Sequence, residues 1–258
     1  IGSGVEGSAA EKVFHGSLKK IYISDTDEEV VAGARRNICR TLTKRSRVTI
    51  QPFVGSFCEP LTERRMCADL IHANIPNLPA VGNVDLSGGE KKGTFLQSSL
   101  YEGYNPPDEF IHYALGAQYA YLRSAVEALT PTGSVLTEVG GRVPLSLLVK
   151  LFQDNGFTRV KEVLAGFKRQ TEAAINFAGY HEFEKEYGVA FDYYLYKQSV
   201  SVLAEHCVEG SILSAEMSGD ELKRLLSPYR VSAGAALELH RKGISVGHTV
   251  HIIQGSRG

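Results

Sequence analysis

Apolar and polar residues recur along this chain with two different periods, and each period predicts one kind of element. Helices are predicted over residues 8–14, 28–42, 109–129 and 144–155, where apolar positions recur every three or four residues. Strands are predicted over residues 20–24, 47–53, 68–73, 134–139, 160–166 and 190–196, which are short apolar or alternating runs. Strands that alternate with helices indicate an α/β fold whose sheet is mainly parallel, with helices on both faces.

The last part of the chain breaks this alternation. Residues 218–221 read as a capping box, so a helix is predicted to follow, and a second helix is expected over 232–242 and a strand over 248–253. We therefore expect a main domain over residues 1–200 and an α/β extension over 201–258 that packs on it. Residues 80–108 lack any clear period, which predicts a substrate-facing or mobile loop.

Composition narrows the class of protein. The chain has 258 residues, 43% of them hydrophobic, with a net charge of −1 and no dense basic tract, so nothing favours a nucleic-acid partner. No apolar run approaches the roughly 20 residues of a membrane span. The four cysteines lack C-x-x-C spacing and are typical of reduced thiols in a cytoplasmic protein. No metal-ligand cluster is expected, and the oligomeric state stays open, a homodimer included.

Two features near the start suggest a nucleoside site. Residues 2–7 read GSGVEG, a glycine turn that lets backbone approach a bulky ligand closely. Asp25 ends the strand 20–24, where a carboxylate can accept two hydrogen bonds from a ribose diol. A tight turn with a surface aspartate, or the cofactor site of a nicotinamide dehydrogenase, would give the same pattern. Because the turn follows Ile1 directly, we expect a longer natural chain with a strand before it.

Four sequence blocks, taken in their order along the chain, resemble class I S-adenosylmethionine-dependent methyltransferases, including the protein-glutamine methyltransferases. The blocks are residues 2–7, residues 23–25 with 34–37, residues 55–61 and residues 69–76. The resemblance implies a Rossmann-like fold with a seven-stranded, mainly parallel sheet and S-adenosylmethionine as the cofactor. It implies a cofactor site formed by Gly2, Ser3, Gly4, Asp25, Thr26, Gly55, Ser56, Phe57 and Asn74.

A narrower resemblance is to the methyltransferase domain of methionine S-methyltransferases. It rests on residues 75–77, on residues 140–142 with the helix up to Phe157, on residues 170–172 and 191–194, and loosely on residues 243–248. Where glutamine-modifying relatives read Asn-Pro-Pro-Tyr, this chain reads Asn-Ile-Pro-Asn and lacks the ring that stacks on a planar acceptor. The implied reaction is methyl transfer to the thioether of free methionine, giving S-methylmethionine. A thioether has no proton to lose, so no general base is required and no catalytic residue is assigned.

The acceptor residues follow from the chemistry of methionine. Arg142 is the candidate for its carboxylate, because a guanidinium fork matches a carboxylate, with a surface ion pair or helix-start residue as the alternative. Glu172 is the candidate for the ammonium group, unless it is simply exposed. Tyr101 and Tyr104 could line the pocket for the methionine sulfur or pack in the core. Ile75 and Pro76 are the remaining candidate substrate-binding residues. A methyltransferase acting on a protein or small amine, an oxidoreductase using NAD and a non-catalytic nucleoside-binding module remain the alternatives.

Overall fold

The chain is described from a computed structural model that covers residues 4–42, 46–75, 78–79, 95–170, 177–206 and 217–258. It forms two compact units, Ile1–Ala68 and Asp69–Gly258. The domain boundary predicted near residue 200 stays a prediction, and residues 80–94 of the predicted loop lie outside the described ranges. Within those ranges, none of the helices is both long enough and apolar enough to cross a membrane.

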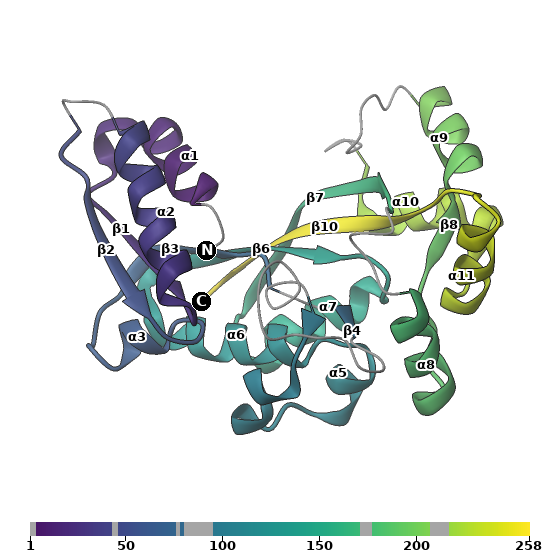
Figure 1. Cartoon of the computed structure of the whole chain (residues 1–258), viewed down its shortest axis with the longest axis horizontal. Coiled ribbons are helices and arrows are strands. Elements are labelled where there is room, and N and C mark those ends of the chain that lie inside the picture. The colour runs from purple at the N-terminus through teal and green to yellow at the C-terminus, as the bar shows by residue number, and fades with distance from the viewer. Residues whose placement is uncertain (1–3, 43–45, 76–77, 80–94, 171–176, 207–216) are drawn as a thin grey trace. The chain divides into compact units, whose positions relative to one another are not determined.

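The first unit is built on a parallel β–α–β element (Figure 1). Two strands pair in parallel, from Lys20 opposite Thr49 to Asp25 opposite Val54, so that their carboxyl ends lie side by side. The elements in order are α1 (Val5–Phe14), η1 (His15–Ser17), β1 (Lys20–Asp25), α2 (Glu28–Thr41), β2 (Thr49–Val54) and α3 (Glu59–Thr62). These bounds confirm the predicted strand–helix–strand order.

The core of this unit lies between β1 and α2. It buries Ile21 and Ile23 of β1 and Val31, Ala34 and Ile38 of α2. Alternate residues of a strand share one face, and residues three or four apart share one face of a helix, so these side chains face each other. The helix predicted over 28–42 thus faces the sheet with Ala34 and Ile38, and Leu42, its C-cap, packs against the same core. In the first turn, Val31 is buried rather than Val30.

The second unit contains a six-stranded sheet with the order β3-β6-β10-β8-β9, in which β7 also pairs with β10 (Figure 1). The strands are β3 (Ala68–Ala73), β6 (Leu129–Gly140), β7 (Arg159–Arg169), β8 (Tyr193–Leu195), β9 (Arg230–Val231) and β10 (Val246–Ser256). β10 runs antiparallel to β6, β7 and β8. The α/β class is therefore confirmed, but the prediction of a seven-stranded, mainly parallel sheet is wrong for the described residues. Alternation along a strand is the same in both directions and cannot reveal this.

Helices cover both faces of this sheet at β8. Successive strand residues point to opposite faces of a sheet, so the side chains of Tyr193 and Tyr194 lie on opposite faces. Tyr194 packs with Phe167 in a cluster that includes Leu203 of α9 and Leu222 of α10, while Tyr193 meets Phe177 of α8, with 5.2 Å between ring centroids. The helices of this unit are α5 (Asp108–His112), α6 (Gly116–Ala128), α7 (Leu145–Asp154), α8 (Phe177–Tyr187), α9 (Tyr196–Glu205), α10 (Gly219–Leu226) and α11 (Ala233–Arg241).

Two local predictions fail and one is confirmed. The helix predicted over 109–129 is interrupted at Ala114, whose φ of 57° is left-handed, so α5 and α6 are separate. The strand predicted over 134–139 begins earlier, because residues 129–133 belong to β6 as well. The capping box is confirmed, since Ser218 accepts from the Glu221 backbone and the Glu221 carboxylate accepts from the Ser218 N–H. The remaining short elements are β4 (Leu78–Pro79), β5 (Phe95–Leu96), η2 (Ser98–Leu100), η3 (Glu102–Tyr104) and η5 (Ser227–Tyr229).

Candidate functional site

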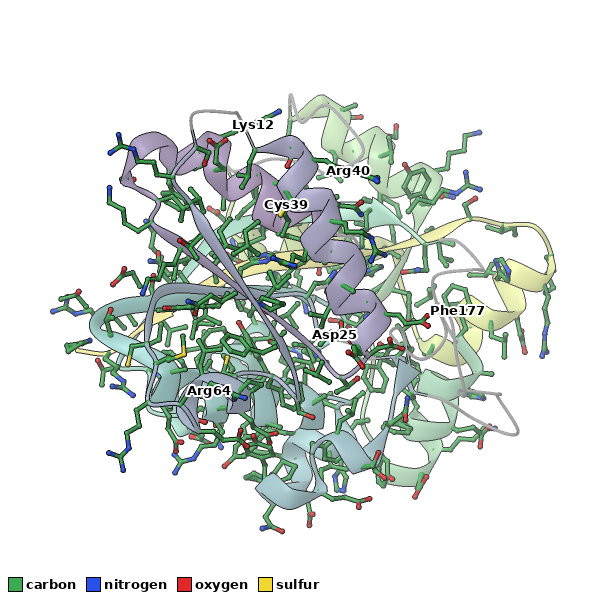
Figure 2. All side chains as sticks on the ribbon, turned by 60° about the vertical axis from the view of Figure 1, so that its left-hand side comes forward. Lys12, Asp25, Cys39, Arg40, Arg64 and Phe177 are labelled. Carbon is green, nitrogen blue, oxygen red and sulfur yellow. The ribbon has the colours of Figure 1, made fainter. Side chains whose placement is uncertain are left out.

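Five of the predicted cofactor residues, Asp25, Thr26 and Gly55 to Phe57, lie at the carboxyl ends of β1 and β2. The Gly55 N–H donates to the carbonyl of Asp25 at 2.9 Å, and the Ser24 hydroxyl donates to the carbonyl of Phe57 at 2.8 Å. These two bonds hold the exit loops of the strands, Asp25–Thr26 and Gly55–Phe57, next to each other. In Figure 2 the label of Asp25 marks this point, where α2 begins.

Two neighbouring acids have different tasks here. Asp27 is the N-cap of α2, and its side chain accepts from the N–H groups of Glu29 and Val30. Asp25 is half-buried, and its Oδ1 accepts from the Asp27 N–H at 3.2 Å. The helix is therefore capped by Asp27, and Asp25 stands at the end of the strand where a ligand of a parallel sheet would bind.

The exit loop of β2 is held in an uncommon backbone conformation. Phe57 has a φ of 46°, in the left-handed region that bulky residues seldom adopt. A side chain at Gly55 would meet Pro60, with only 2.5 Å between its Cβ and Cγ of Pro60. Strained loops of this kind often occur at ligand sites. The loop predicted to flank the cofactor thus has a specific, closely packed backbone conformation.

The glycine turn has a structural cause as well. Gly4 has a φ of 81°, and a Cβ there would lie 2.9 Å from the carbonyl oxygen of Ala34 and 3.1 Å from Cγ1 of Ile38. Glycine is therefore required at this position for α1 to pack on α2, whether or not a ligand binds. Gly2 and Ser3 lie outside the described residues.

The predicted acceptor residue Arg142 is buried in the second unit. It follows β6 directly, is 5% exposed, and its guanidinium lies over the ring of Tyr180, 4.9 Å from the centroid. Gly140 makes this possible, since a Cβ there would lie 2.5 Å from Nη2 of Arg142. Arg142 is therefore not a surface residue, as one of the two alternatives for it required.

The structure does not bring all predicted acceptor residues to Arg142. Tyr101 is buried against Gly116 at the start of α6, where burial and, less strongly, Glu102 raise the pKa of its hydroxyl. This favours a packing role for Tyr101. The carbonyl of Ile75 accepts from Gln118 at 3.2 Å. Tyr104 is half-buried in η3 and Asn74 is exposed after β3, while Pro76 and Glu172 lie outside the described residues.

Sequence reasoning missed the partners of Arg142. These are Tyr180 of α8, Tyr193 of β8 and His248 of β10, all of which interact electrostatically with the guanidinium. Tyr193 and His248 fall within the blocks 191–194 and 243–248 of the narrower resemblance, but nothing in the sequence placed either of them beside Arg142. Among the described residues no group of three His, Cys, Asp or Glu side chains is placed to hold a metal ion.

Burial fixes the protonation of this cluster. It raises the pKa values of Tyr180 and Tyr193, against the opposing effect of Arg142, so both hydroxyls keep their protons. Burial, with the charges of Arg142 and Lys168, lowers the pKa of His248 well below its ordinary range. Arg142 therefore carries the charge among these four side chains at neutral pH.

No protein-family model matches this chain, and no curated protein does. Among solved structures it is similar to a TehB-like SAM-dependent methyltransferase from Corynebacterium glutamicum, with 14% identity and a TM-score of 0.35 over 64% of each chain. It is also similar to a phosphoethanolamine N-methyltransferase 2 from Haemonchus contortus, in complex with phosphomonomethylethanolamine and S-adenosylhomocysteine. The sequence identity is 13% and the TM-score 0.38, and the match covers 100% of this chain and 47% of that chain.

The YcgJ protein from Bacillus subtilis matches at 11% identity and a TM-score of 0.40, over 97% of this chain and 88% of that one. This chain thus spans less than two thirds of the length of the first two structures. TM-scores below 0.5 describe a loose likeness, so function has to be inferred from the residues of the chain itself.

Proposed function

We propose that this chain is an S-adenosylmethionine-dependent methyltransferase whose acceptor is the thioether of free methionine. The observation that carries the proposal is the junction at the ends of β1 and β2, where Asp25 and the loop 55–57 lie side by side. Ligands of parallel α/β sheets bind beyond the carboxyl ends of the strands. A carboxylate there suits a ribose diol, and a shaped loop beside it suits an adenine.

The order of the sequence blocks supports the same cofactor. Each of the four blocks that resemble class I methyltransferases includes an element end: residues 2–7 lead into α1, residues 23–25 end β1, residues 55–61 follow β2 and residues 69–76 include the end of β3, while residues 34–37 lie within α2. In the first unit this places Gly4, Asp25, Thr26 and residues 55–57 at element ends. Asn74 follows β3 in the second unit. A nicotinamide dehydrogenase would explain the first two blocks but not the third and fourth.

The acceptor is inferred from the second unit. A buried guanidinium matches the carboxylate of a free amino acid, because its fork can bind two carboxylate oxygens. Around Arg142, aromatic rings are abundant: Tyr180 lies 4.7 Å from Phe191 and 6.1 Å from Tyr193, measured between ring centroids. Aromatic faces stabilise a cation by roughly 0.5–2 kcal/mol each, which suits a product sulfonium.

S-Adenosylmethionine, when bound, would supply its sulfonium methyl group to the methionine sulfur, leaving S-adenosylhomocysteine. One carbon–sulfur bond breaks as another forms, the positive charge passes to the new sulfonium, and no proton moves. The task of the protein is then to bind, align and exclude water. Arg142 would hold the acceptor by its carboxylate, and Asp25 would hold the ribose.

Binding of S-adenosylhomocysteine to Asp25 variants tests this proposal. Asp25→Ala removes both carboxylate oxygens, and Asp25→Asn keeps an acceptor for the Asp27 N–H while losing the charge. Calorimetry should show affinity reduced about 10- to 100-fold in the alanine variant, since hydrogen bonds to a charged group contribute roughly 1.5–3 kcal/mol. Glu63→Ala, which removes an exposed acid of the same unit, should bind as the wild type does.

Unchanged affinity in both Asp25 variants would falsify the cofactor assignment. A wild-type melting temperature that rises with NAD and not with S-adenosylhomocysteine would favour the dehydrogenase instead. If the cofactor product binds but methionine does not, the methyltransferase proposal survives with a different acceptor.

A further inference from the structure

Four elements of the second unit converge on one buried polar cluster. Arg142 follows β6, Tyr180 lies on α8, Tyr193 on β8 and His248 on β10. All four side chains are at most 5% exposed. Arg142 lies over the Tyr180 ring and hydrogen-bonds its hydroxyl. Gly247 lies opposite Tyr194 in the antiparallel register of β10 and β8, so His248 and Tyr193, each one position along its strand, point to the same face of the sheet.

Two polar atoms of this cluster lack a hydrogen-bond partner among the described residues. They are the hydroxyl oxygen of Tyr193 and Nδ1 of His248. Buried polar atoms are almost always paired, so two unpaired atoms on adjacent strands require an explanation. The acid nearest to Tyr193 is Glu184, but its carboxylate already accepts from the backbone N–H groups of Phe191, Ala233 and Gly234.

The two unpaired atoms define the chemistry of a ligand. Tyr193 offers an O–H donor, the neutral ring of His248 can donate or accept at Nδ1, and Arg142 nearby carries a permanent positive charge. An anion with several acceptor oxygens would pair with Tyr193 and His248 and be attracted by Arg142. The rings of Phe177 and Phe191 pack against Tyr193 and Tyr180, respectively, so the surroundings of the two unpaired atoms are aromatic and suit a ligand whose remaining part is apolar or a soft cation.

The cluster borders a half-exposed part of the sheet. Lys168 is the register partner of His248 on β7, and it forms an ion pair with Glu138 of β6 at 3.0 Å. The side chains of this pair are 39% and 37% exposed, so solvent reaches the neighbouring position on the same face. Lys168 therefore adds a partly exposed positive charge next to the cluster.

We propose that Arg142, Tyr193 and His248 form a buried subsite for the carboxylate of a free amino acid acceptor. This inference rests on the proposed function and deepens it: Arg142 supplies the charge, Tyr193 donates to the carboxylate, and His248 Nδ1 completes its hydrogen bonds. Tyr193 and His248 are specificity residues, since neither takes part in the methyl transfer. They select the acid form of the acceptor.

Tyr193→Phe tests this, because it removes one oxygen and leaves the ring. Calorimetry with L-methionine, on protein saturated with S-adenosylhomocysteine, should show affinity reduced about 10- to 150-fold. Binding of methionine amide, already weak, should change little. The melting temperature of the ligand-free variant should rise by a few degrees, because an unpaired buried hydroxyl has gone. Weaker binding together with higher stability is the signature of a ligand contact.

Tyr194→Phe is the matched control, since Tyr194 is the next residue, equally buried and directed to the opposite face. It should leave methionine affinity unchanged. His248→Leu should weaken methionine binding as Tyr193→Phe does. The subsite is refuted if wild-type protein binds the amide as well as the acid, or if Tyr193→Phe binds methionine like the wild type. Methionine is also titrated without S-adenosylhomocysteine, so that failure of the cofactor assignment is seen separately.

Discussion

At the scale of single residues, the unusual feature is a buried arginine. Removing a guanidinium from water is costly unless other groups interact with it. In this chain the cost is offset by the face of Tyr180 and by its hydroxyl. The missing side chain at Gly140 provides the space. A residue held in this way is pre-organised, which is what a charge clamp requires.

Arg142→Ala should therefore remove the acceptor's binding and leave that of the cofactor. Losing a desolvated, charge-assisted contact costs about 2–5 kcal/mol, which is roughly 30- to several-thousand-fold in methionine affinity. Arg142→Lys should not restore it, because an ammonium group cannot reproduce the planar fork. Calorimetry with methionine and with S-adenosylhomocysteine measures both effects.

Arg169→Ala is the control for this experiment. Arg169 ends β7 and also lies over a tyrosine ring, 5.9 Å from the centroid of Tyr196, but it is exposed. It should bind methionine as the wild type does. If the Arg142→Ala variant still prefers methionine to its amide, Arg142 is not the clamp.

At the scale of elements, the carboxylate of Glu162 joins β7, β10 and α10. Nδ1 of His251 on β10 lies 2.5 Å from Oε1 of Glu162 on β7, and Oε2 of Glu162 accepts from the N–H of Gly219, the first residue of α10. Burial raises the pKa of Glu162, but the bonds from His251 and Gly219 outweigh it, so the pKa is lowered. The charged carboxylate is thus the form that holds these elements together.

Glu162→Gln should destabilise the protein in a pH-dependent way. A carboxyl whose pKa is lower in the folded state contributes stability above its unfolded pKa, near 4.5, and loses it as the pH falls through the folded pKa. At pH 7 the variant should lose about 1.5–3 kcal/mol of unfolding free energy, and below pH 4 the difference should shrink. Urea unfolding at both pH values measures this.

Glu138→Gln serves as the comparison, since its ion pair with Lys168 is half-exposed and should contribute less than about 1 kcal/mol. An equal loss at pH 7 in both variants would contradict the role given to Glu162. A loss in Glu162→Gln that stays constant down to pH 3 would show that the carboxylate charge is not what matters.

At the scale of the whole molecule, the proposed ligand residues are divided between the two compact units. Asp25 and the loop 55–57 lie in the first unit, and Arg142, Tyr193 and His248 in the second. Each group was inferred from contacts within its own unit. Each of the two proposed ligands should therefore protect a different set of residues from hydrogen exchange.

Hydrogen exchange, measured by mass spectrometry on the full chain, can show which segments each ligand protects. S-Adenosylhomocysteine should slow amide exchange over residues 22–27 and 54–58, because a bound ligand stabilises the segments it contacts. L-Methionine should slow it over residues 142–143, 191–195 and 246–250. NAD is the control ligand and should change neither set. Protection by methionine confined to the first unit would refute the assignment of the acceptor residues.

Sequence alone determined the local structure of this protein well. The bounds of β1 and β3 agree with the predicted ones to within one residue, and α10 begins after the predicted capping box at Ser218, because periodicity and capping residues act over a few positions. The meeting of Asp25 with the loop 55–57 also followed from sequence, because consecutive parallel strands end at the same edge. The binding roles of these residues stay predictions.

The tertiary structure decided what depends on residues far apart in the chain. The direction of β10 between β6 and β7, the break at Ala114 and the packing of Gly4 on α2 are set by pairing and close contact, which no local period encodes. The same holds for the cluster at Arg142. Its members lie up to 106 positions apart (142 to 248), and only the folded sheet, by burying them together, gives them a shared charge and two unpaired polar atoms.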